Sequence, residues 1–563
     1  QKTAYEISLG LVGSEMCIRD SVLHKHWPYP LRITDGNLVI GSKQTRINQI
    51  HAQGLSNQES QFIADGIIAY DKGRTVPDVK ITATDVVLDD FLIASIPKPQ
   101  RQWIYQLGIS GVLDAQSHVH ATDNGLIDFE ITSILRDGQS QPSNSPFQIN
   151  LTNVKSIISR GNIQIKQLDG DFGHANIRGT ATDDWDGDQP MLAIDLEAKR
   201  LRFEDPIIDL LPADQLPQSL VTAIKQCNPT GTYNAQLHAT QHLTGLINYQ
   251  IKLQPHELEV DWAGHRIALN NMAGNVIFTP DGADLKSLSA NYNAGKFTTS
   301  GHVTLGDQLA VDLVVSAKSS GLGSLERAVV PHDIEHIIDQ LQLESAYEIE
   351  SADITYHPEA VSGSRLAFRG RTRLINASAQ VGAPMTDLNG LLDVDVTYLA
   401  GQQWPDVKMR LEADHLRIHN RQISPLSLSI SNGPHPREMM IENILGHCYG
   451  GMVFGSGRLG QNGYFSLYGI MQDVALEPFL NPVNQMALGG DRSAVGSTHG
   501  LISSNIAIEG YYGDKQPRKG RGQVIVRQAN LYNLPLSLTL EQLLNLTFPS
   551  AQSFNAASAG YLI

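Results

Sequence analysis

PKPQRQWIYQLGISGVL, the stretch that begins at Pro97, recurs twice in the chain, as PQSLVTAIKQCNPTGTY from Pro217 and as PHDIEHIIDQLQLESAY from Pro331. The three copies align without a gap, and each keeps apolar residues at intervals of three and four. That spacing places one apolar stripe along a short helix, and proline is tolerated in a first helical turn because an N–H there has no helical partner. The sequence therefore predicts tandem repeats, each with one short helix.

A pair of glycines separated by five residues follows each predicted helix. The pairs begin at Gly173, Gly295 and Gly451, which lie 76, 78 and 120 residues beyond the three prolines. The third repeat is therefore longer by 42 to 44 residues, and its inserted residues alternate between apolar and polar as strands do. Glycine at a fixed place in a strand indicates a tight turn, a bulge or the close approach of neighbouring strands.

An amphipathic strand is predicted after the glycine pair. Every second side chain of a strand lies on the same face of its sheet. These alternate positions are apolar in the first two repeats, and in the two strands predicted within the insertion of the third. The apolar positions are Leu192, Ile194, Leu196, Val311, Leu313, Val315, Leu392, Val394, Val396, Val407, Met409 and Leu411.

These signals divide the chain into six parts. They are residues 1–21, an N-terminal β segment over 22–96, repeats over 97–216, 217–330 and 331–480, and a C-terminal β segment over 481–563 that contains a predicted docking helix, Leu536–Phe548. Residues 1–21 are excluded because Ser8–Ser21 resembles the translation of a sequencing adapter. We expect the chain to be an internal fragment of a longer protein.

Composition excludes several classes of protein. With 41% hydrophobic and 18% charged residues the chain is too apolar to be disordered. A net charge of −16 argues against nucleic acid as a partner, because phosphates bind basic surfaces. Beyond residue 21 only Cys227 and Cys448 remain, which do not make a disulfide framework, and Cys227 is expected to pack in a core. No stretch reaches the roughly 20 apolar residues of a membrane-spanning helix.

No motif assembles a catalytic or cofactor site. The chain lacks a G-x-S-x-G elbow, an H-E-x-x-H pair and a G-x4-G-K-[ST] phosphate loop, so neither an enzyme activity nor a cofactor is expected. Asp183–Asp188 has the alternating carboxylates of a calcium loop, but Gln189 stands where such a loop has glycine, which favours a solvated turn. His118 and His120 share a strand face without a third ligand nearby, so a zinc site is not expected.

So many one-sided strands pose a question of burial. Apolar area left in water costs about 25 cal/mol per Å², and one short helix per repeat cannot cover them. Either the strands close into an array of dry sandwich modules with a structural or adhesion role, or the sheet curls into a trough with an apolar floor. A carbohydrate-active protein is disfavoured, because it needs a carboxylate pair and stacking aromatic residues, which make up only 6% of the chain.

The strand HCYGGMVFGSGRL, His447–Leu459, follows MIENI from Met440 and precedes YFSLY from Tyr464. With this order of strands and glycines the chain resembles, over about 30–563, the AsmA-like superfamily of bacterial envelope proteins, which includes TamB-type and YdbH-type proteins. The resemblance implies a mainly β, elongated and curled groove, shaped like a taco, in the periplasm. It also implies an inner-membrane anchor through an N-terminal helix that is missing here, and transport of phospholipid between membranes or a part in outer-membrane assembly.

We therefore expect a non-enzymatic protein whose apolar strand positions form the floor of a lipid groove. Its expected partners are phospholipid, the surfaces of the inner and outer membranes, and other envelope proteins. One basic cluster stands out in a loop rich in glycine and proline, and it is expected to be solvated or to contact anionic headgroups. The cluster consists of Lys515, Arg518, Lys519 and Arg521.

Overall fold

The structure of the chain is a computed structural model. It describes residues 21–562 except 25–26, 72–73, 97, 123–125, 143–147, 185–190, 206–225, 243–246, 263, 294, 305–308, 324, 327–334, 336–337, 340, 358–363, 381–383, 403, 436, 461–462, 481–498, 512–517 and 529–555. Residues 1–20 of the excluded segment and the predicted docking helix Leu536–Phe548 lie outside the described residues.

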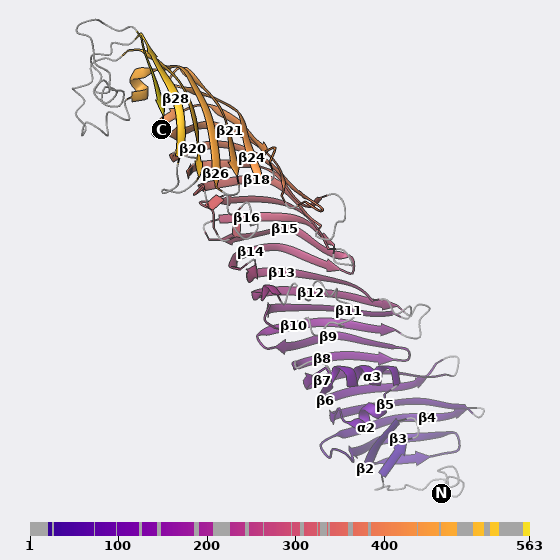
Figure 1. Cartoon of the computed structure of the whole chain (residues 1–563). Helices are drawn as coiled ribbons and strands as arrows, with labels where there is room; N and C mark the ends of the chain where they lie inside the picture. The colour runs from indigo at the N-terminus through magenta and orange to yellow at the C-terminus, as the bar shows by residue number, and fades with distance from the viewer. Residues whose placement is uncertain are drawn as a thin grey trace, which may run out of the picture. The chain divides into compact units, whose positions relative to one another are not determined.

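The described residues are mostly strands, as the sequence predicts, and they divide into two compact units, called here the N-terminal unit and the C-terminal unit (Figure 1). The strands of the N-terminal unit are β1 (Ser21–His24), β2 (Trp27–Ile40), β3 (Gln44–Gly54), β4 (Gln61–Asp71), β5 (Arg74–Val87), β6 (Ile109–Ala121), β7 (Ile127–Ser140), β8 (Ile149–Ser159), β9 (Asn162–Phe172), β10 (Ala175–Asp184), β11 (Met191–Arg202) and β12 (Thr230–His242). Two further strands, β13 (Ile247–Trp262) and β14 (His265–Thr279), contribute residues to both units.

The strands of the C-terminal unit are β15 (Gly282–Tyr292), β16 (Gly295–Thr304), β17 (Ala310–Ser319), β18 (Glu344–Tyr356), β19 (Ser364–Gln380), β20 (Pro384–Leu399), β21 (Asp406–Ile418), β22 (Arg421–Ile423), β23 (Leu426–Asn432), β24 (Glu438–Cys448), β25 (Gly451–Gly460), β26 (Tyr464–Ala475), β27 (Leu501–Tyr511), β28 (Arg518–Arg527) and β29 (Ala556–Leu562). The alternation predicted within the insertion of the third repeat is confirmed, because its two segments form β20 and β21.

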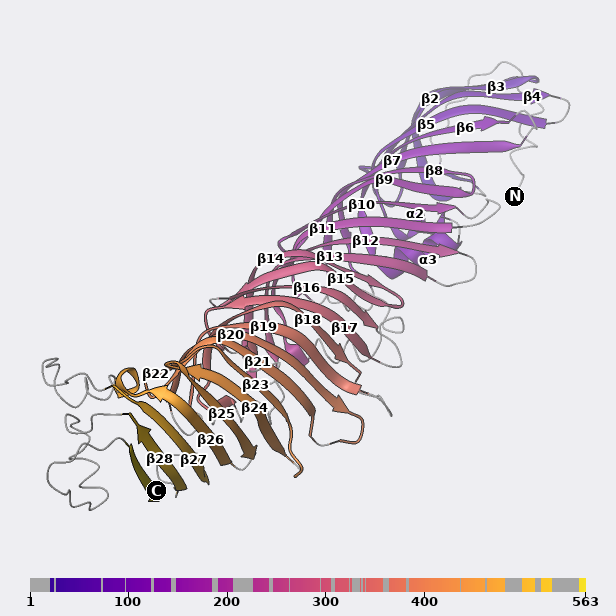
Figure 2. The ribbon, with the colours of Figure 1, turned by 90° about the horizontal axis from the view of Figure 1, so that it is seen from above.

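Each unit is an open antiparallel sheet in which a strand pairs with the next strand of the chain, and β22 and β23 together pair with β21. Within the described part of either unit, no pairing joins the first strand to the last. The strands are visibly curved (Figure 2). Such ladders satisfy the backbone N–H and C=O groups while one side of each sheet stays free of a second sheet.

Strand pairing continues across the expected repeat boundaries. β5 pairs with β6, β11 with β12, and β17 with β18, although the boundaries expected at 96, 216 and 330 fall between these strands. The alternative of separately sealed sandwich modules requires the ladder to stop at those points. At these three points the ladder does not stop, so the alternative of sealed modules is wrong.

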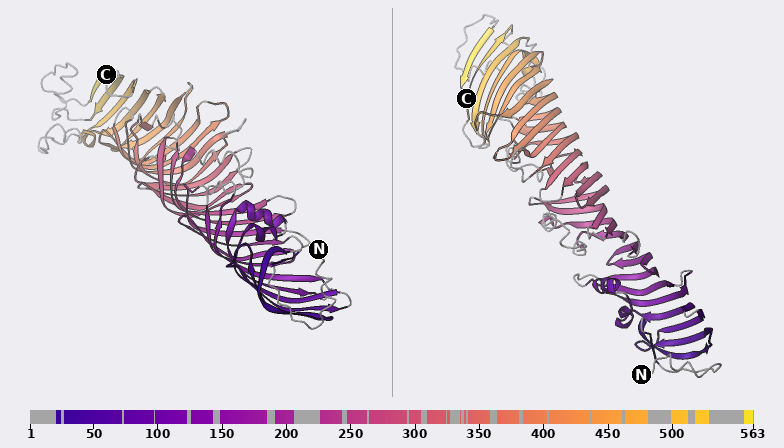
Figure 3. Two further views of the ribbon diagram at one scale, coloured as in Figure 1. Left: turned by 90° about the horizontal axis from the view of Figure 1, so that it is seen from below. Right: turned by 90° about the vertical axis from the view of Figure 1, so that its right-hand side faces the viewer.

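Two short helices lie between β5 and β6. They are α2 (Asp90–Ala94) and α3 (Lys98–Leu107), and Figure 3 shows them on the same side of the N-terminal sheet. The Asp89 carboxylate caps α2 by accepting a hydrogen bond from the Leu92 N–H at 2.9 Å. α3 is the first predicted repeat helix and is confirmed. The helices predicted from Pro217 and Pro331 lie mostly outside the described residues, so one helix per repeat stays a prediction.

Within each sheet the long connections lie at the same end of the strands. Six strands, β6–β11, separate the connection that holds α2 and α3 from the connection after β11. An even number of antiparallel strands returns the chain to the end from which it started. In the C-terminal unit eight strands, with β22 and β23 counted as one, separate the connections after β17 and β26. The third predicted repeat thus has two more strands than the first, in keeping with its greater length.

Candidate functional site

One face of the C-terminal sheet carries a continuous apolar row. Residues that pair directly in an antiparallel ladder point to the same face. One row runs from β17 to β21 through Leu313, Ile354, Phe368, Val396 and Val407. A second row crosses β20 to β27 through Val394, Met409, Ile430, Ile441, Gly457, Leu467 and Ile508. The groove candidates of β17, β20 and β21 therefore share one face.

The N-terminal sheet has the same arrangement. One row from β6 to β12 consists of Leu113, Leu135, Val154, Leu168, Gly179, Leu196 and Leu237. The neighbouring row from β4 to β12 consists of Phe62, Ala83, Ala115, Ser133, Ser156, Ile165, Ala181, Ile194 and Ala239. Its two serines hydrogen-bond each other through their hydroxyls. We call the side of each sheet that bears these rows its apolar face.

The second glycine of each predicted pair accommodates a leucine of the next strand. At Gly179 an added Cβ would lie 2.4 Å from Cδ2 of Leu196 and 2.5 Å from the carbonyl oxygen of Asp195, which is too close for any side chain. The same glycine–leucine pair recurs in each repeat, as Gly179 with Leu196, Gly301 with Leu313, and Gly457 with Leu467. Close strand approach, one of the three predicted roles of these glycines, is therefore confirmed.

The first glycine of the pair has two different roles. Gly173 lies in the β9–β10 turn at φ 56°, a left-handed conformation that favours glycine, with nothing near its missing side chain. Gly295 and Gly451 instead begin their strands. Relative to the second glycine of the pair, the turn in the first repeat is thus two residues closer than in the other two. Because this displacement is an even number of residues, every side chain stays on the same face.

Short helices and loops cover parts of the apolar faces. In the N-terminal unit Leu92 of α2 packs on a buried cluster that contains Phe62 and Val86. In the C-terminal unit Leu476 and Leu480, in a single helical turn after β26, belong to a buried cluster with Leu411. Val407 is fully buried in another cluster, against which Trp404 packs. Val407 and Leu411 are therefore core residues, and their expected place on an accessible floor is wrong.

The other groove candidates are half-buried. They are Leu192, Ile194, Leu196, Val311, Leu313, Val315, Leu392, Val394, Val396 and Met409. Each of these side chains leaves apolar area in water. Covering that area with a further apolar group lowers the free energy by about 25 cal/mol per Å².

The opposite face of the C-terminal sheet is charged. Arg369 Nε lies 3.2 Å from Asp395 Oδ1, and Arg371 Nε lies 2.6 Å from Asp393 Oδ1. The hydrogen bond from Arg371 lowers the pKa of Asp393. Exposed ion pairs of this kind contribute about 0–1 kcal/mol each, so they keep this face solvated more than they hold the sheet together.

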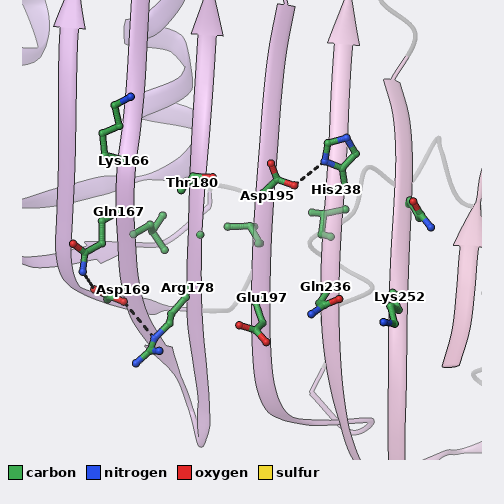
Figure 4. A pocket seen from close by; sticks show the side chains of 15 residues that line it. Lys166, Gln167, Asp169, Arg178, Thr180, Asp195, Glu197, Gln236, His238 and Lys252 are labelled. Carbon is green, nitrogen blue, oxygen red and sulfur yellow. Dashed lines mark hydrogen bonds and ion pairs between the residues drawn. The ribbon is translucent and has the colours of Figure 1, made fainter. Parts of the chain in front are cut away.

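A polar depression of about 850 Å³ lies over β9–β13 of the N-terminal unit (Figure 4). Its lining mixes both signs of charge: His238 Nδ1 lies 2.7 Å from Asp195 Oδ1, and Arg178 Nε lies 3.5 Å from Asp169 Oδ1. The side chains of Arg178, Asp195 and His238 occupy the face opposite to the apolar rows. Leu168, Leu196 and Leu237 of the apolar row also line the depression, so its lining is mixed in polarity.

The basic cluster is partly in a strand, where a loop is predicted. Arg518, Lys519 and Arg521 belong to β28, and Lys515 lies outside the described residues. Lys519 and Arg521 are exposed and alternate with Gly520 and Gly522, which pair with Ile508 and Ile506. Both cations therefore lie on the charged face.

The structure gives the surroundings of the histidines and cysteines singled out in the sequence. Asp78, which the sequence analysis missed because it is 40 residues away, holds His118 Nε2 at 2.8 Å. No group of three or more His, Cys, Asp or Glu side chains in the described part of the chain could hold a metal ion. Most of Asp183–Asp188 lies outside that part. Burial raises the pKa of the Cys448 thiol to about 11, so it stays protonated in its core. Cys227 is half-buried, and burial raises its pKa as well.

Comparisons of the chain with family models, with curated protein sequences and with solved structures find no match. Among the described helices, none has the length and apolar character needed to cross a bilayer.

Proposed function

We propose that the apolar faces of the two units bind the acyl chains of phospholipids while the charged faces remain in water. The observation that carries this proposal is the register of the rows: apolar side chains, most of them half-buried and interrupted by glycines and by Ser133 and Ser156, follow one another from strand to strand without a charged residue among them. We propose further, from the resemblance of the sequence, that the protein is an AsmA-like envelope protein of the periplasm. Its role would be non-enzymatic transport of phospholipid between membranes or support of outer-membrane assembly.

The physical basis is simple. Each methylene that leaves water contributes about 0.8 kcal/mol, whereas contacts between alkyl groups have no preferred direction. A tail can therefore be held at many positions along a row with similar free energy, which permits movement from strand to strand. A charge introduced into the row must be desolvated by a bound tail, at a cost of several kcal/mol.

Position 313 offers a matched pair of substitutions. Leu313 lies on the apolar face, and its neighbour Val314 lies on the charged face with 49% of its surface exposed. We expect Leu313→Asp and Val394→Asp to reduce the phospholipid that co-purifies with the full chain at least tenfold. Val314→Asp, which adds the same charge to the same strand, should leave it unchanged.

Phospholipid is measured by mass spectrometry of lipid extracted from the purified protein, with circular dichroism as the check on folding. Folded Leu313→Asp and Val394→Asp proteins that retain wild-type phospholipid would contradict the proposal. So would a wild-type protein that carries none.

A further inference from the structure

A small depression of about 210 Å³ lies over β26, β27 and β28 of the C-terminal sheet. Ile470, Asn505 and Gln523 line it and pair directly across these three strands, so their side chains share one face. Leu467 and Ile508 of the apolar row have the opposite parity on the same strands, so that face is the charged one. Most of the other lining residues have the parity of the charged face, namely Tyr468, Gln472, Ser503, Ile525 and Arg527, whereas Met471 and Ser504 have the opposite parity.

One part of the lining is an exposed aromatic ring. Tyr468 has 48% of its surface exposed. Its direct cross-strand neighbours are Ser456 and Ala507, whose side chains are too short to cover a tyrosine ring. An exposed ring beside a hollow offers a flat apolar platform, and its hydroxyl adds a polar contact. Ile470 and Ile525, which are half-buried, add apolar area to the same lining.

Three exposed carboxamides also line the depression, those of Gln472, Asn505 and Gln523. A carboxamide both donates and accepts hydrogen bonds, as a hydroxyl group does. The two charged residues of the described lining form a pair, because Nη1 of Arg527 lies 3.8 Å from Oδ1 of Asp473. The described lining therefore has no net charge, although the rest of this face is charged.

This combination suits a neutral, hydroxylated ring. A pyranose sugar has an apolar C–H face that can lie on an aromatic ring, and a rim of hydroxyls that can pair with carboxamides. A phosphate or carboxylate would need a positive lining, and a bound acyl chain would leave three carboxamides desolvated without partners. The volume is below the roughly 300–1,000 Å³ of drug-sized sites, so it suits a short segment of one or two rings.

We propose that this depression binds a neutral oligosaccharide. One pyranose ring stacks on Tyr468, and its hydroxyls exchange hydrogen bonds with the carboxamides of Gln472, Asn505 and Gln523. Binding of a sugar, unlike its hydrolysis, needs no carboxylate pair, so the site has no hydrolytic activity. The proposal goes beyond the lipid groove, because the depression uses the opposite face of the sheet and none of the residues of the apolar rows.

The test is titration of the full chain with cellotetraose, maltotetraose and N-acetylchitotetraose, followed by saturation-transfer difference NMR. A small, open site implies a Kd of about 1 mM for at least one of the three. Tyr468→Ala should weaken that binding by about tenfold or more, whereas Tyr468→Phe, which keeps the ring, should change it by about twofold at most. Asn505→Ala should weaken it by about fivefold through lost hydrogen bonds.

Tyr511→Ala is the matched control variant. Tyr511 is 41% exposed and pairs with Tyr464 on the same face, outside the depression. This variant should bind the sugar as the wild type does, and circular dichroism checks that all variants are folded. Co-purifying phospholipid, unchanged in Tyr468→Ala, reports separately on the groove.

Four results would each overturn the proposal. The first is a wild-type protein that binds none of the three sugars with a Kd below about 10 mM. The second is a folded Tyr468→Ala protein that binds as tightly as the wild type. The third is tighter binding of the anionic sugar tetragalacturonate than of the neutral ones. The fourth is equally tight binding of acetyl-tetraglycine amide, which would indicate a peptide site.

Discussion

Gly179 gives the sharpest test of how the apolar face is built. In Gly179→Ala the new methyl group would lie 2.4 Å from Cδ2 of Leu196 and 2.5 Å from the carbonyl oxygen of Asp195. An ordinary contact begins at about 3.4 Å, so both neighbours must move by about 1 Å, and one of them is the backbone of the paired strand. Overpacking of this kind costs about 1–3 kcal/mol.

Gly173→Asn is the matched control within the same glycine pair. Gly173 has φ 56° and nothing within 4 Å of an added Cβ, and asparagine adopts this conformation readily. We expect a change below about 0.5 kcal/mol, typical of a surface substitution. The double variant Gly179→Ala with Leu196→Ala removes the closest contact, so its effect should be smaller than the sum of the single effects.

Amide hydrogen exchange measures these changes locally, because it reports the free energy of opening for individual strands. The amides of β10 and β11 in the Gly179→Ala protein should open more readily by about 1–3 kcal/mol. Equal protection in Gly179→Ala and Gly173→Asn would refute the reasoning. So would strictly additive effects in the double variant.

Three further predictions concern contacts that fasten the sheets. Glu326→Ala removes the carboxylate that accepts hydrogen bonds from the buried hydroxyls of Tyr292 and Tyr347. The free energy of opening at the start of β18 should fall by about 1–3 kcal/mol, so its amides exchange faster, and Glu326→Gln should lower that free energy by less. The hydrogen bond from Arg136 lowers the pKa of Asp114 below its usual 3.8. The pair therefore stabilises β5–β7 above that pH, and the stabilisation is lost as the pH falls through the lowered pKa. In an acid titration followed by hydrogen exchange, Asp114→Asn should reduce this loss of stability. Arg421→Met removes a guanidinium that lies 4.5 Å from the Phe479 ring centre and donates to the Phe479 carbonyl at 3.2 Å; residues 476–480 should open more readily by about 1–2 kcal/mol, and unchanged exchange there would contradict the assigned contact.

The faces of the strands could be predicted from the sequence because the period of two is local. Leu313 and Val394 share an apolar face as their alternation indicates, and the insertion of the third repeat is a pair of strands. What covers a strand is not local. Val407 and Leu411 follow the same alternation as Met409, yet Val407 belongs to a buried cluster on which Trp404 packs, and Leu411 belongs to a buried cluster that includes Leu476 of the helical turn. Sequence spacing carries no information on such contacts.

Local sequence patterns also could not predict the ion pairs, or that the glycine-rich basic segment forms a strand. The carboxylate that holds His118 comes from Asp78 on the preceding strand, and pairing between strands determines that contact. Lys519 and Arg521 stand in a sequence rich in glycine, which predicts a loop. The ladder with β27 makes it a strand, because Gly520 and Gly522 fit opposite isoleucines. Tertiary pairing here overrides local preference.

Site-specific photocrosslinking to phospholipid tests the central claim most directly. A benzophenone amino acid is placed singly at Ile194, Leu313 or Val394 on the apolar faces, and at their neighbours Asp195, Val314 or Asp395 on the charged faces. The account predicts that illumination joins phospholipid to the chain at the first three positions and not at the other three. Crosslinks of equal yield on both faces, or none at the apolar positions of the folded protein, would contradict it.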